Sequence, residues 1–543
     1  MTAARHDSSL RRAGTDLRLL LVAALAPLLG SLAVLLRRAA SYTPTGDDAI
    51  IERTVRQVGA HAVLLGPYSR FGWHHPGPAM FYLLAAPYRL LGQASVALPL
   101  ATLVLNAACI VGIAVVLHRR AGTVAMVWGL VVLSAYLHAQ GPGFLVDDWN
   151  PYLPMLPFCL GVLLCWSLLA GERWPLPVCV AIGTLCVQSH VGYAIGVAAV
   201  SGATAVGLVG ALAVRPRTPS PPVAAGSWRW PLLVAGGVTA LLWAPVVVQQ
   251  LTGHPGNLTQ LANYFGGAQP SWTYAQGVRE LSTSMGRLPA LVTRTAPQPG
   301  FLTPAELPTW SGAVGAIGAA GAALLIAMRH RSAVPFVGLV SVLCVAVVVA
   351  VQRVVGLLFS YLVPFTWAAG VLVWMLVGVA ISLELRRVPR GLAARGRYRG
   401  GALVAAAAGL LLAFVPVAVR TSRPTPVNMP ELRPLTDTVL RWGAQHPGAL
   451  VKLDAAPGTG LVGATYPMVG LYVRLERAGM PVRVPAAWNA ILGPAASAGV
   501  EHARWLVVVA LTDGSSAPPA RGQQLLARFG PVQAYVSRLP APG

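Results

Sequence analysis

Eleven long apolar runs, separated by polar segments, set the pattern of the chain. Most of them are near the roughly 20 residues that a helix needs to cross a bilayer, although the fifth is short and the tenth is long. The runs occupy residues 17–36, 94–117, 122–138, 152–170, 174–189, 191–214, 231–249, 311–328, 333–351, 354–383 and 401–419. This pattern predicts an α-helical polytopic membrane protein with about eleven transmembrane helices over residues 1–420.

The last part of the chain, residues 421–543, has a different pattern. Short apolar segments rich in β-branched residues occur at 449–453, 481–485, 505–511 and 532–537. Helical patterns fall at 434–446, 461–479 and 521–528. Alternation of strands and helices is typical of small layered domains. We therefore expect residues 421–543 to form a small C-terminal α/β domain.

Composition supports a membrane location. Of 543 residues, 55% are hydrophobic and 10% are charged, whereas about a quarter of a soluble protein is charged. The chain has 40 basic and 17 acidic residues, a net charge of +23. Basic residues that flank apolar runs are topology signals, so we expect no nucleic-acid partner. The six Cys lie inside apolar runs, which excludes a disulfide framework and the usual Cys-based zinc site.

Arginine placement predicts the orientation. With the N-terminus inside, the six short cytoplasmic segments hold 17 Arg in 61 residues, whereas the three long outer segments hold 9 in 131. Positive charge favours the cytoplasmic side. We expect a multi-pass plasma-membrane protein with a cytoplasmic N-terminus, an uncleaved first helix and an extracytoplasmic C-terminus. Its long outer loops would be 37–93 and 250–310.

Two adjacent acidic pairs lie just outside predicted spans on this outer side, Asp47-Asp48 and Asp147-Asp148. Carboxylates at a membrane surface are costly unless they are solvated or partnered, and they are functional candidates. Simple solvation is one alternative. For the first pair, which precedes an amphipathic helical pattern, capping of that helix is another. Capping requires only one Asp. Two acidic pairs on the same predicted side of the membrane, in a chain with few acidic residues, favour a functional role.

A polar motif follows the first pair in the same loop, before the second apolar run. It contains Tyr68, Arg70, His74 and His75. Aromatic residues are common anchors at the membrane interface, which explains part of this segment. The histidines are followed by two prolines, which stiffen the backbone and hold the imidazoles in place. The loop is therefore a candidate site and more than a connector.

The order of these features resembles the GT-C glycosyltransferases of the protein-mannosyltransferase type. Those enzymes carry an Asp-Glu pair after the first transmembrane helix and a His-Pro-Pro motif before the second. Here the pair is Asp47-Asp48 and the motif is His75-Pro76-Gly77-Pro78. The departures are Asp at 48 and Gly at 77. The resemblance implies a GT-C-like membrane domain and transfer of a sugar from a polyprenyl-phosphate donor, with inversion, to a glycan, lipid or protein acceptor of the cell envelope.

The resemblance also implies residue roles. Asp47 matches the first acid of the family pair and would be the catalytic base, and Asp48 would orient the acceptor. Arg353, Arg70 and His75 would bind the donor phosphate, although Arg353 at the end of a run is equally explained by snorkelling. Seven residues would line the acceptor cavity: His74, Tyr68, Asp147, Asp148, Asn150, Gln188 and His190. A structural, hydrogen-bonded role explains His190 at least as well. A divalent cation, Mg²⁺ or Mn²⁺, would be held by Asp48 and Asp148 if the reaction uses one.

Three rival functions remain open. A lipid or glycan transporter or flippase would place ionisable residues near the midplane, and the apolar runs are nearly free of charge. A glycan ligase or polymerase of the other GT-C architecture would work with Arg and His. A non-catalytic scaffold would bind a partner through residues 421–543. Mutation of Asp47 separates an enzyme with an Asp base from all three.

Overall fold

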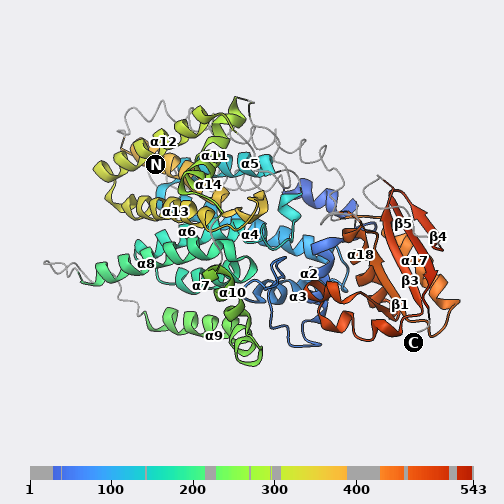
Figure 1. The fold of residues 1–543 in the computed structure, drawn as a ribbon. Coiled ribbons are helices and arrows are strands. Elements are labelled where there is room, and N and C mark those ends of the chain that lie inside the picture. The colour runs from blue at the N-terminus through green and yellow to red at the C-terminus, as the bar shows by residue number, and fades with distance from the viewer. Residues whose placement is uncertain are drawn as a thin grey trace, which may run out of the picture. The chain divides into compact units, whose positions relative to one another are not determined.

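The computed structural model describes residues 28–37, 39–140, 143–213, 228–267, 271–293, 295, 307–387, 428–457, 463–512 and 522–540 (Figure 1). Contacts divide the chain into two compact units. The helical unit comprises Met1–Ala33 and Thr102–Ser422, and the mixed unit comprises Val34–Ala101 and Arg423–Gly543. The sequence-based boundary at residue 420 assigned the segment 34–101 to the membrane domain, whereas its contacts group it with the C-terminal residues.

The apolar runs form helices. Seven described helices are long and apolar enough to cross a membrane, and Leu28–Arg37, Met155–Leu169 and Pro175–Ser189 are shorter apolar helices. The helices that follow the runs are α4 (Ala97–Ala121), α5 (Thr123–Gln140), α6 (Met155–Leu169), α7 (Pro175–Ser189), α8 (Ala194–Ala213), α9 (Arg229–Thr252), α12 (Thr309–Arg329), α13 (Val334–Gln352) and α14 (Phe365–Leu385). The predicted multi-pass helical architecture is confirmed. The run 401–419 lies outside the described residues.

The predicted outer loop 250–310 contains two helices, α10 (Asn257–Gly267) and α11 (Tyr274–Val292). Helix α11 packs against α5, α12, α13 and α14. Glycines permit this close approach, because a Cβ on Gly286 or Gly312 would collide with Ser311 or Ser282. This part of the loop is therefore an integral element of the helix bundle.

The connectors of the helical unit gather at two ends. At one end, Glu172 after α6 pairs with Arg119 (3.1 Å) and Arg120 of α4. There too, the Ser382 hydroxyl near the end of α14 donates to the Ala121 carbonyl. The α5–α6, α7–α8 and α13–α14 connectors contact one another at the other end, described below. Such a separation is what alternating spans require, while the side of the membrane on which each end lies stays a prediction.

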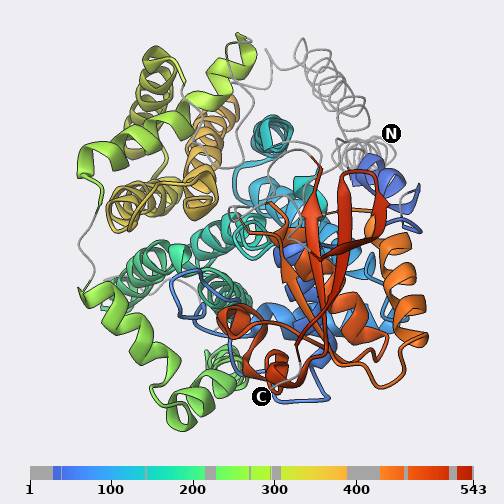
Figure 2. The same ribbon diagram turned by 45° about the vertical axis from the view of Figure 1, so that its right-hand side comes forward.

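The mixed unit contains a five-stranded sheet of order β2-β1-β3-β5-β4. Figure 2 shows strands of this sheet in red. Its strands are β1 (Val451–Ala455), β2 (Val482–Arg483), β3 (Trp505–Leu511), β4 (Gln524–Phe529) and β5 (Val532–Arg538). Its helices are α2 (Gly46–Gln57), α3 (Ala79–Leu90), α17 (Leu432–Ala444), α18 (Thr465–Arg477) and the short α19 (Asn489–Leu492). β1 pairs in parallel with β2 and β3, whereas β5 is antiparallel to β3 and β4. The predicted small C-terminal sheet domain is confirmed.

One element of this domain was predicted wrongly. Residues 521–528 have a helical pattern, but the structure forms strand β4 over Gln524–Phe529. The strand pairs with β5 through a tight turn at Gly530, whose φ is +54°. Pairing with a neighbouring strand outweighs the weak helical propensity of a short segment.

The core of the mixed unit lies between one sheet face and its helices. Alternate strand residues such as Leu453 and Val507 belong to this core and lie on strands that pack against α18, as the two-residue period of a strand allows. Ala49 and Ile50 of α2 belong to the same buried cluster. Helix α2, with the first acidic pair, is therefore held by the same core as the C-terminal sheet.

Candidate active site

The first acidic pair occupies the first turn of α2. The helix begins at Gly46, whose φ of +51° favours glycine, and the ring of Tyr466 lies within 2.9 Å of where a Cβ would stand. Thr45 is the N-cap, so neither Asp serves as the N-cap residue. Asp47 accepts a 2.7 Å hydrogen bond from the Tyr68 hydroxyl, and Asp48 is 4% exposed. The helix N-terminus favours negative charge at both positions.

The loop that supplies Tyr68 has a defined backbone. The Ser69 amide donates to the Trp73 carbonyl and the His75 amide donates to the Pro67 carbonyl, each at 2.8 Å. Gly72 makes the turn between them at a φ of +83°. These bonds pair the segment of Tyr68 with the segment of the histidines. The motif that the sequence singled out therefore has a defined, hydrogen-bonded backbone.

The polar side chains of this loop have different environments. His74 Nδ1 lies 3.0 Å from the Gly66 carbonyl, and burial lowers the pKa of His74 although this hydrogen bond opposes the shift. His75 is buried, with its ring perpendicular to Trp73 at 5.4 Å. Arg70 is exposed, and its guanidinium lies 4.8 Å from the ring centre of Phe71. His74 is therefore neutral at pH 7, and Arg70 supplies a cation at the surface.

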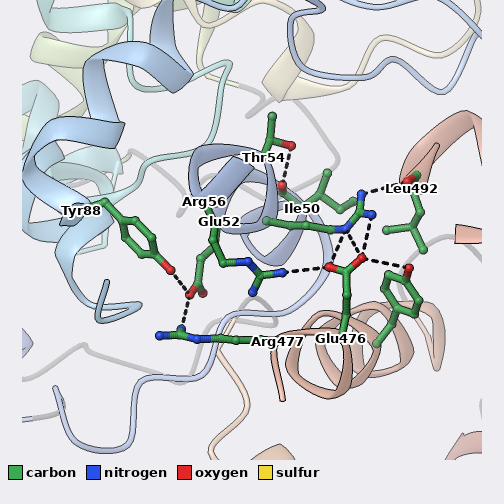
Figure 3. A network of polar contacts seen from close by, with 10 residues as sticks. Ile50, Glu52, Thr54, Arg56, Tyr88, Glu476, Arg477 and Leu492 are labelled. Atoms are coloured by element: carbon green, nitrogen blue, oxygen red, sulfur yellow. Dashed lines mark hydrogen bonds and ion pairs between the residues drawn. The ribbon is translucent and has the colours of Figure 1, made fainter. Parts of the chain in front are cut away.

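A polar network behind the acidic pair was missed by sequence reasoning. Glu52, 3% exposed, accepts hydrogen bonds from Tyr88 and Arg477, each at 2.9 Å (Figure 3). It accepts a third from Ser95 at 3.0 Å. Glu52 follows Asp48 by one helical turn, so an acid on the buried face of α2 was the available signal. Its partner Arg477 is 425 residues away in the sequence, and no local pattern could reveal it.

The second acidic pair lies in the α5–α6 connector of the helical unit. Asp148 is 2% exposed, and the Asp147 carboxylate accepts a 3.0 Å bond from the Trp149 amide. Removal from water raises the pKa of Asp147 to about 6, although the Trp149 amide opposes the shift. Asn150 donates to the Ser189 carbonyl at 3.0 Å.

The backbone of this connector is held by side chains from other helices. The Leu145 carbonyl accepts from Asn106 of α4, and the Pro151 carbonyl accepts from the Tyr193 hydroxyl, each at 3.0 Å. Buried backbone carbonyls need such partners. The bonds fix the position of the acidic pair between Leu145 and Pro151.

Gln188 and His190 lie at the α7–α8 junction at the same end of the bundle. Gln188 is fully buried and donates to the Leu242 carbonyl of α9 at 2.9 Å. His190 Nδ1 accepts a 3.2 Å bond from the Gly192 amide, which leaves the ring proton on Nε2. Burial lowers the pKa of His190 to about 3. His190 is thus a neutral, hydrogen-bonded imidazole, and its role at the acceptor cavity stays a prediction.

Aromatic rings surround the second acidic pair. Trp149 lies 5.4 Å from Tyr152 and 5.0 Å from Tyr361, which stacks on Phe359 at 5.6 Å. Sequence reasoning missed Tyr361 because the run 354–383 was predicted as one helix. The structure begins α14 only at Phe365, because Pro364 cannot continue a helix on its N-terminal side.

Arg353 is the C-cap residue of α13 and is exposed. A cation at this position is stabilised by the helix dipole. Within the described part of the chain, its guanidinium makes no hydrogen bond or ion pair, so this charge is not neutralised there. The role of Arg353 in binding the donor phosphate stays a prediction.

Two buried charged residues of α11 were also missed in the sequence. Glu280 and Arg287 are 8% and 5% exposed, and the Arg287 guanidinium lies 3.5 Å from the ring centre of Trp367 in α14. The sequence placed both residues in an outer loop. Their burial follows from the packing of α11 into the bundle, which only the tertiary structure reveals.

The residues singled out in the sequence fall into two groups. Those of the mixed unit are Asp47, Asp48, Tyr68, Arg70, His74 and His75. Those of the helical unit are Asp147, Asp148, Asn150, Gln188, His190 and Arg353. Among the described residues, no three His, Cys, Asp or Glu side chains gather as metal ligands, and a cation held by Asp48 and Asp148 stays a prediction.

Comparisons with known proteins identify the fold. No protein-family model and no curated protein matches the chain. The structure of ArnT from Cupriavidus metallidurans bound to undecaprenyl phosphate matches with a TM-score of 0.52 at 13% identity, over 93% of this chain and 96% of that chain. ArnT in the apo state matches with a TM-score of 0.51 at 15% identity, over 93% and 97%. The arabinofuranosyltransferase AftD from Mycobacteria matches at 16% identity and a TM-score of 0.41, over 97% of this chain and 40% of that chain.

The two ArnT matches extend over almost the whole of both chains. They include the apolar helices and the C-terminal sheet domain described above. This chain therefore shares the fold of the ArnT structures, and the GT-C-like helical fold class predicted from the sequence is confirmed.

Proposed function

We propose that this protein is an integral membrane glycosyltransferase. It transfers a sugar from a polyprenyl-phosphate donor to a glycan, lipid or protein acceptor of the cell envelope. The observation that carries the proposal is the fold match over 93% of the chain to ArnT, whose structure was solved with undecaprenyl phosphate bound. A fold hosts more than one activity, so the residues must support the chemistry independently.

The first acidic pair provides that support. In the proposed step, Asp47 takes the proton of the acceptor hydroxyl as its oxygen attacks the anomeric carbon of the donor. The bond between that carbon and the phosphate oxygen breaks, and the configuration inverts. The Tyr68 hydroxyl, 2.7 Å from the carboxylate, orients Asp47, and the buried Asp48 beside it orients the acceptor.

The departing polyprenyl phosphate carries additional negative charge and needs a cation beside it. The exposed guanidiniums of Arg353 and Arg70 are our candidates. Because burial lowers the pKa of the neighbouring His74, that imidazole is suited to hydrogen bonding rather than to charge neutralisation. We assign His74 to the acceptor and His75 to the donor phosphate.

Within the helical unit, the second acidic pair is our candidate for binding sugar hydroxyls of the acceptor. Carboxylates and amides hold sugar hydroxyls, and aromatic rings pack on sugar faces. Asp147, Asp148 and Asn150 lie next to Trp149 and Tyr361 in one connector region. This combination supports sugar binding more than a structural role alone. Gln188, whose hydrogen bond joins α7 to α9, and the buried His190 would line the wall of this region.

The test is release of polyprenyl phosphate by the purified full chain in nanodiscs. Wild type and Asp47→Asn are supplied with polyprenyl-phosphate mannose and polyprenyl-phosphate arabinofuranose, with an envelope glycan extract as acceptor. Asn keeps an oxygen that can accept the Tyr68 bond, so the local structure should persist. We expect release by the wild type with one donor and a loss of about 100- to 10,000-fold in the variant, which is what a general base contributes.

A matched control is Asp454→Asn, an equivalent change in the same unit. The Asp454 carboxylate accepts bonds from the Ala455 amide and the Trp488 indole, which Asn can also accept. We expect this variant to keep wild-type activity. Equal release by wild type and Asp47→Asn would remove Asp47 as the base. No release with any donor would favour the transporter alternative. A flux assay with the protein in closed lipid vesicles would then test it.

A further inference from the structure

The mixed unit contains a cavity of about 460 Å³ that is separate from the acidic pair. It is enclosed by α2, the segment before α4, and helices α17 and α18. Its volume lies in the range of about 300–1,000 Å³ that is typical of sites for small ligands. No residue of this cavity was singled out in the sequence.

Three arginines line the cavity: Arg433, Arg474 and Arg477. Two acids, Glu52 and Asp437, also line it, but the Glu52 carboxylate already accepts a 2.9 Å hydrogen bond from Arg477. The remaining charge of the lining is therefore positive.

The guanidiniums of Arg433 and Arg474 each make one hydrogen bond within the described part of the chain, and that of Arg474 is the more buried. The Nε of Arg474 donates to the Thr436 hydroxyl at 3.0 Å. Within the described part of the chain, its two terminal nitrogens make no hydrogen bond or ion pair. Burial and the nearby guanidinium of Arg433 lower the pKa of Arg474, and Asp437 and Glu52 only partly offset this. An anion in the cavity would relieve the repulsion and accept the remaining donors.

The position of the cavity in the mixed unit indicates a lipid. Ala39 lies two residues beyond the apolar helix Leu28–Arg37, and Val96 immediately precedes the apolar helix α4. The lining therefore includes the points where two apolar helices end in the polar part of the unit. Basic pockets near the ends of membrane helices bind phosphate headgroups of lipids. A planar guanidinium can bind a phosphate through two parallel hydrogen bonds.

We propose that this cavity binds a phosphate ester, with Arg474 as its principal ligand and Arg433 beside it. The volume exceeds the needs of a bare phosphate ion, which favours a phospholipid headgroup over free phosphate. The site does not depend on the transfer reaction, because neither Asp47 nor Asp48 lines the cavity. It would hold the mixed unit to an anionic membrane surface.

Two probes distinguish the two sources of phosphate. Inorganic phosphate is titrated into the full-length protein in detergent by calorimetry. In parallel, native mass spectrometry measures retention of phosphatidylglycerol by protein released from nanodiscs of digalactosyldiacylglycerol with and without phosphatidylglycerol. Retention of phosphatidylglycerol with weak binding of inorganic phosphate identifies a headgroup, whereas tight binding of inorganic phosphate alone identifies a free anion.

The variants test the assignment of Arg474. We expect Arg474→Gln to weaken binding of the responding probe by about tenfold or more, because charge-assisted hydrogen bonds are lost. Arg433→Gln, on an exposed side chain that donates to the Ala40 carbonyl, should give a smaller loss and is informative even if Arg474→Gln misfolds. The matched control is Arg528→Gln on exposed β4, which removes the same charge outside the cavity. Equal binding by all three variants, or no binding of either probe by the wild type, would overturn the proposal.

Discussion

The contact between α2 and α18 permits a quantitative prediction about how the first acidic pair is held. Glu476 of α18 accepts hydrogen bonds from Arg53 (2.8–3.0 Å) and Arg56 (2.8 Å) of α2, and from Tyr472 (3.2 Å) (Figure 3). Arg53 also donates to the Leu492 carbonyl at 2.9 Å. The carboxylate thus links the helix that carries Asp47 to the C-terminal sheet domain.

The perturbation is Glu476→Gln, which keeps the shape but removes the charge. One carboxylate oxygen becomes an amide group that faces the guanidiniums as a competing donor, so two charge-assisted hydrogen bonds are lost, each worth about 1.5–3 kcal/mol. The Glu476 side chain is 29% exposed, and the partners Arg53 and Arg56 are 12% and 19% exposed. Solvent screening at this exposure reduces the sum to about 2–3 kcal/mol.

Hydrogen exchange of the α2 amides measures this loss directly. If α2 opens locally, a loss of about 2–3 kcal/mol accelerates exchange by about 30- to 150-fold, at about 1.4 kcal/mol per factor of ten. The control is Glu501→Gln in the same unit, because Glu501 is 65% exposed and pairs with the adjacent His502 at 3.4 Å. We expect wild-type exchange in this control. Unchanged α2 exchange in Glu476→Gln would refute the assignment of Glu476 as the link.

Three further predictions concern pH and the turn before α2. Although burial opposes ionisation, the hydrogen bond and charge of Arg53 lower the pKa of Glu476. The stabilising contribution of the ionised Glu476 carboxylate is therefore present at neutral pH and is lost as pH falls through its folded pKa, below about 4.3. We expect hydrogen exchange of the α2 amides to accelerate on acidification in the wild type but hardly in Glu476→Gln. Because the pKa of Asp147 is raised to about 6, its carboxylate should lose its charge as pH falls through that value. We expect the affinity for the acceptor, measured by calorimetry, to fall near pH 6 in the wild type and to be independent of pH in Asp147→Asn. Gly46→Ala meets both a φ of +51° and the Tyr466 ring, whereas Gly448→Ala meets a φ of +77° in open space, so Gly46→Ala should show the lower midpoint in thermal unfolding and the greater loss of polyprenyl phosphate release.

Local patterns were sufficient for most of the secondary structure. An apolar run of about 20 residues has few stable alternatives to a helix in a bilayer, and the described runs are helical for that reason. The strands β3 and β5 lie within a residue of their predicted bounds. The segment that became β4 could not be assigned locally, because its state depends on pairing with β5.

The candidate site was predictable in part, because some of its residues lie close together in the sequence. Asp47 and Tyr68 lie in one loop, and their motif indicated a shared site before the 2.7 Å hydrogen bond was seen. Tyr361 was hidden inside an apolar run, and it was found only through its contact with Trp149. The signal that could have revealed it was Pro364, which interrupts the run.

The sequence by itself determined that this chain is a helical membrane protein with a small C-terminal sheet domain and an acidic pair at the start of an amphipathic helix. These features depend on the period of apolar residues, on turn-forming glycines and on charge, all of which act over a few residues. Only the tertiary structure decided that α2 shares a core with residues more than 380 positions later, such as Leu432. It also decided that Glu52 pairs with Arg477 and that three arginines enclose a cavity. Such contacts depend on which distant segments pack together, and that choice follows from burial of the whole apolar surface rather than from any local pattern.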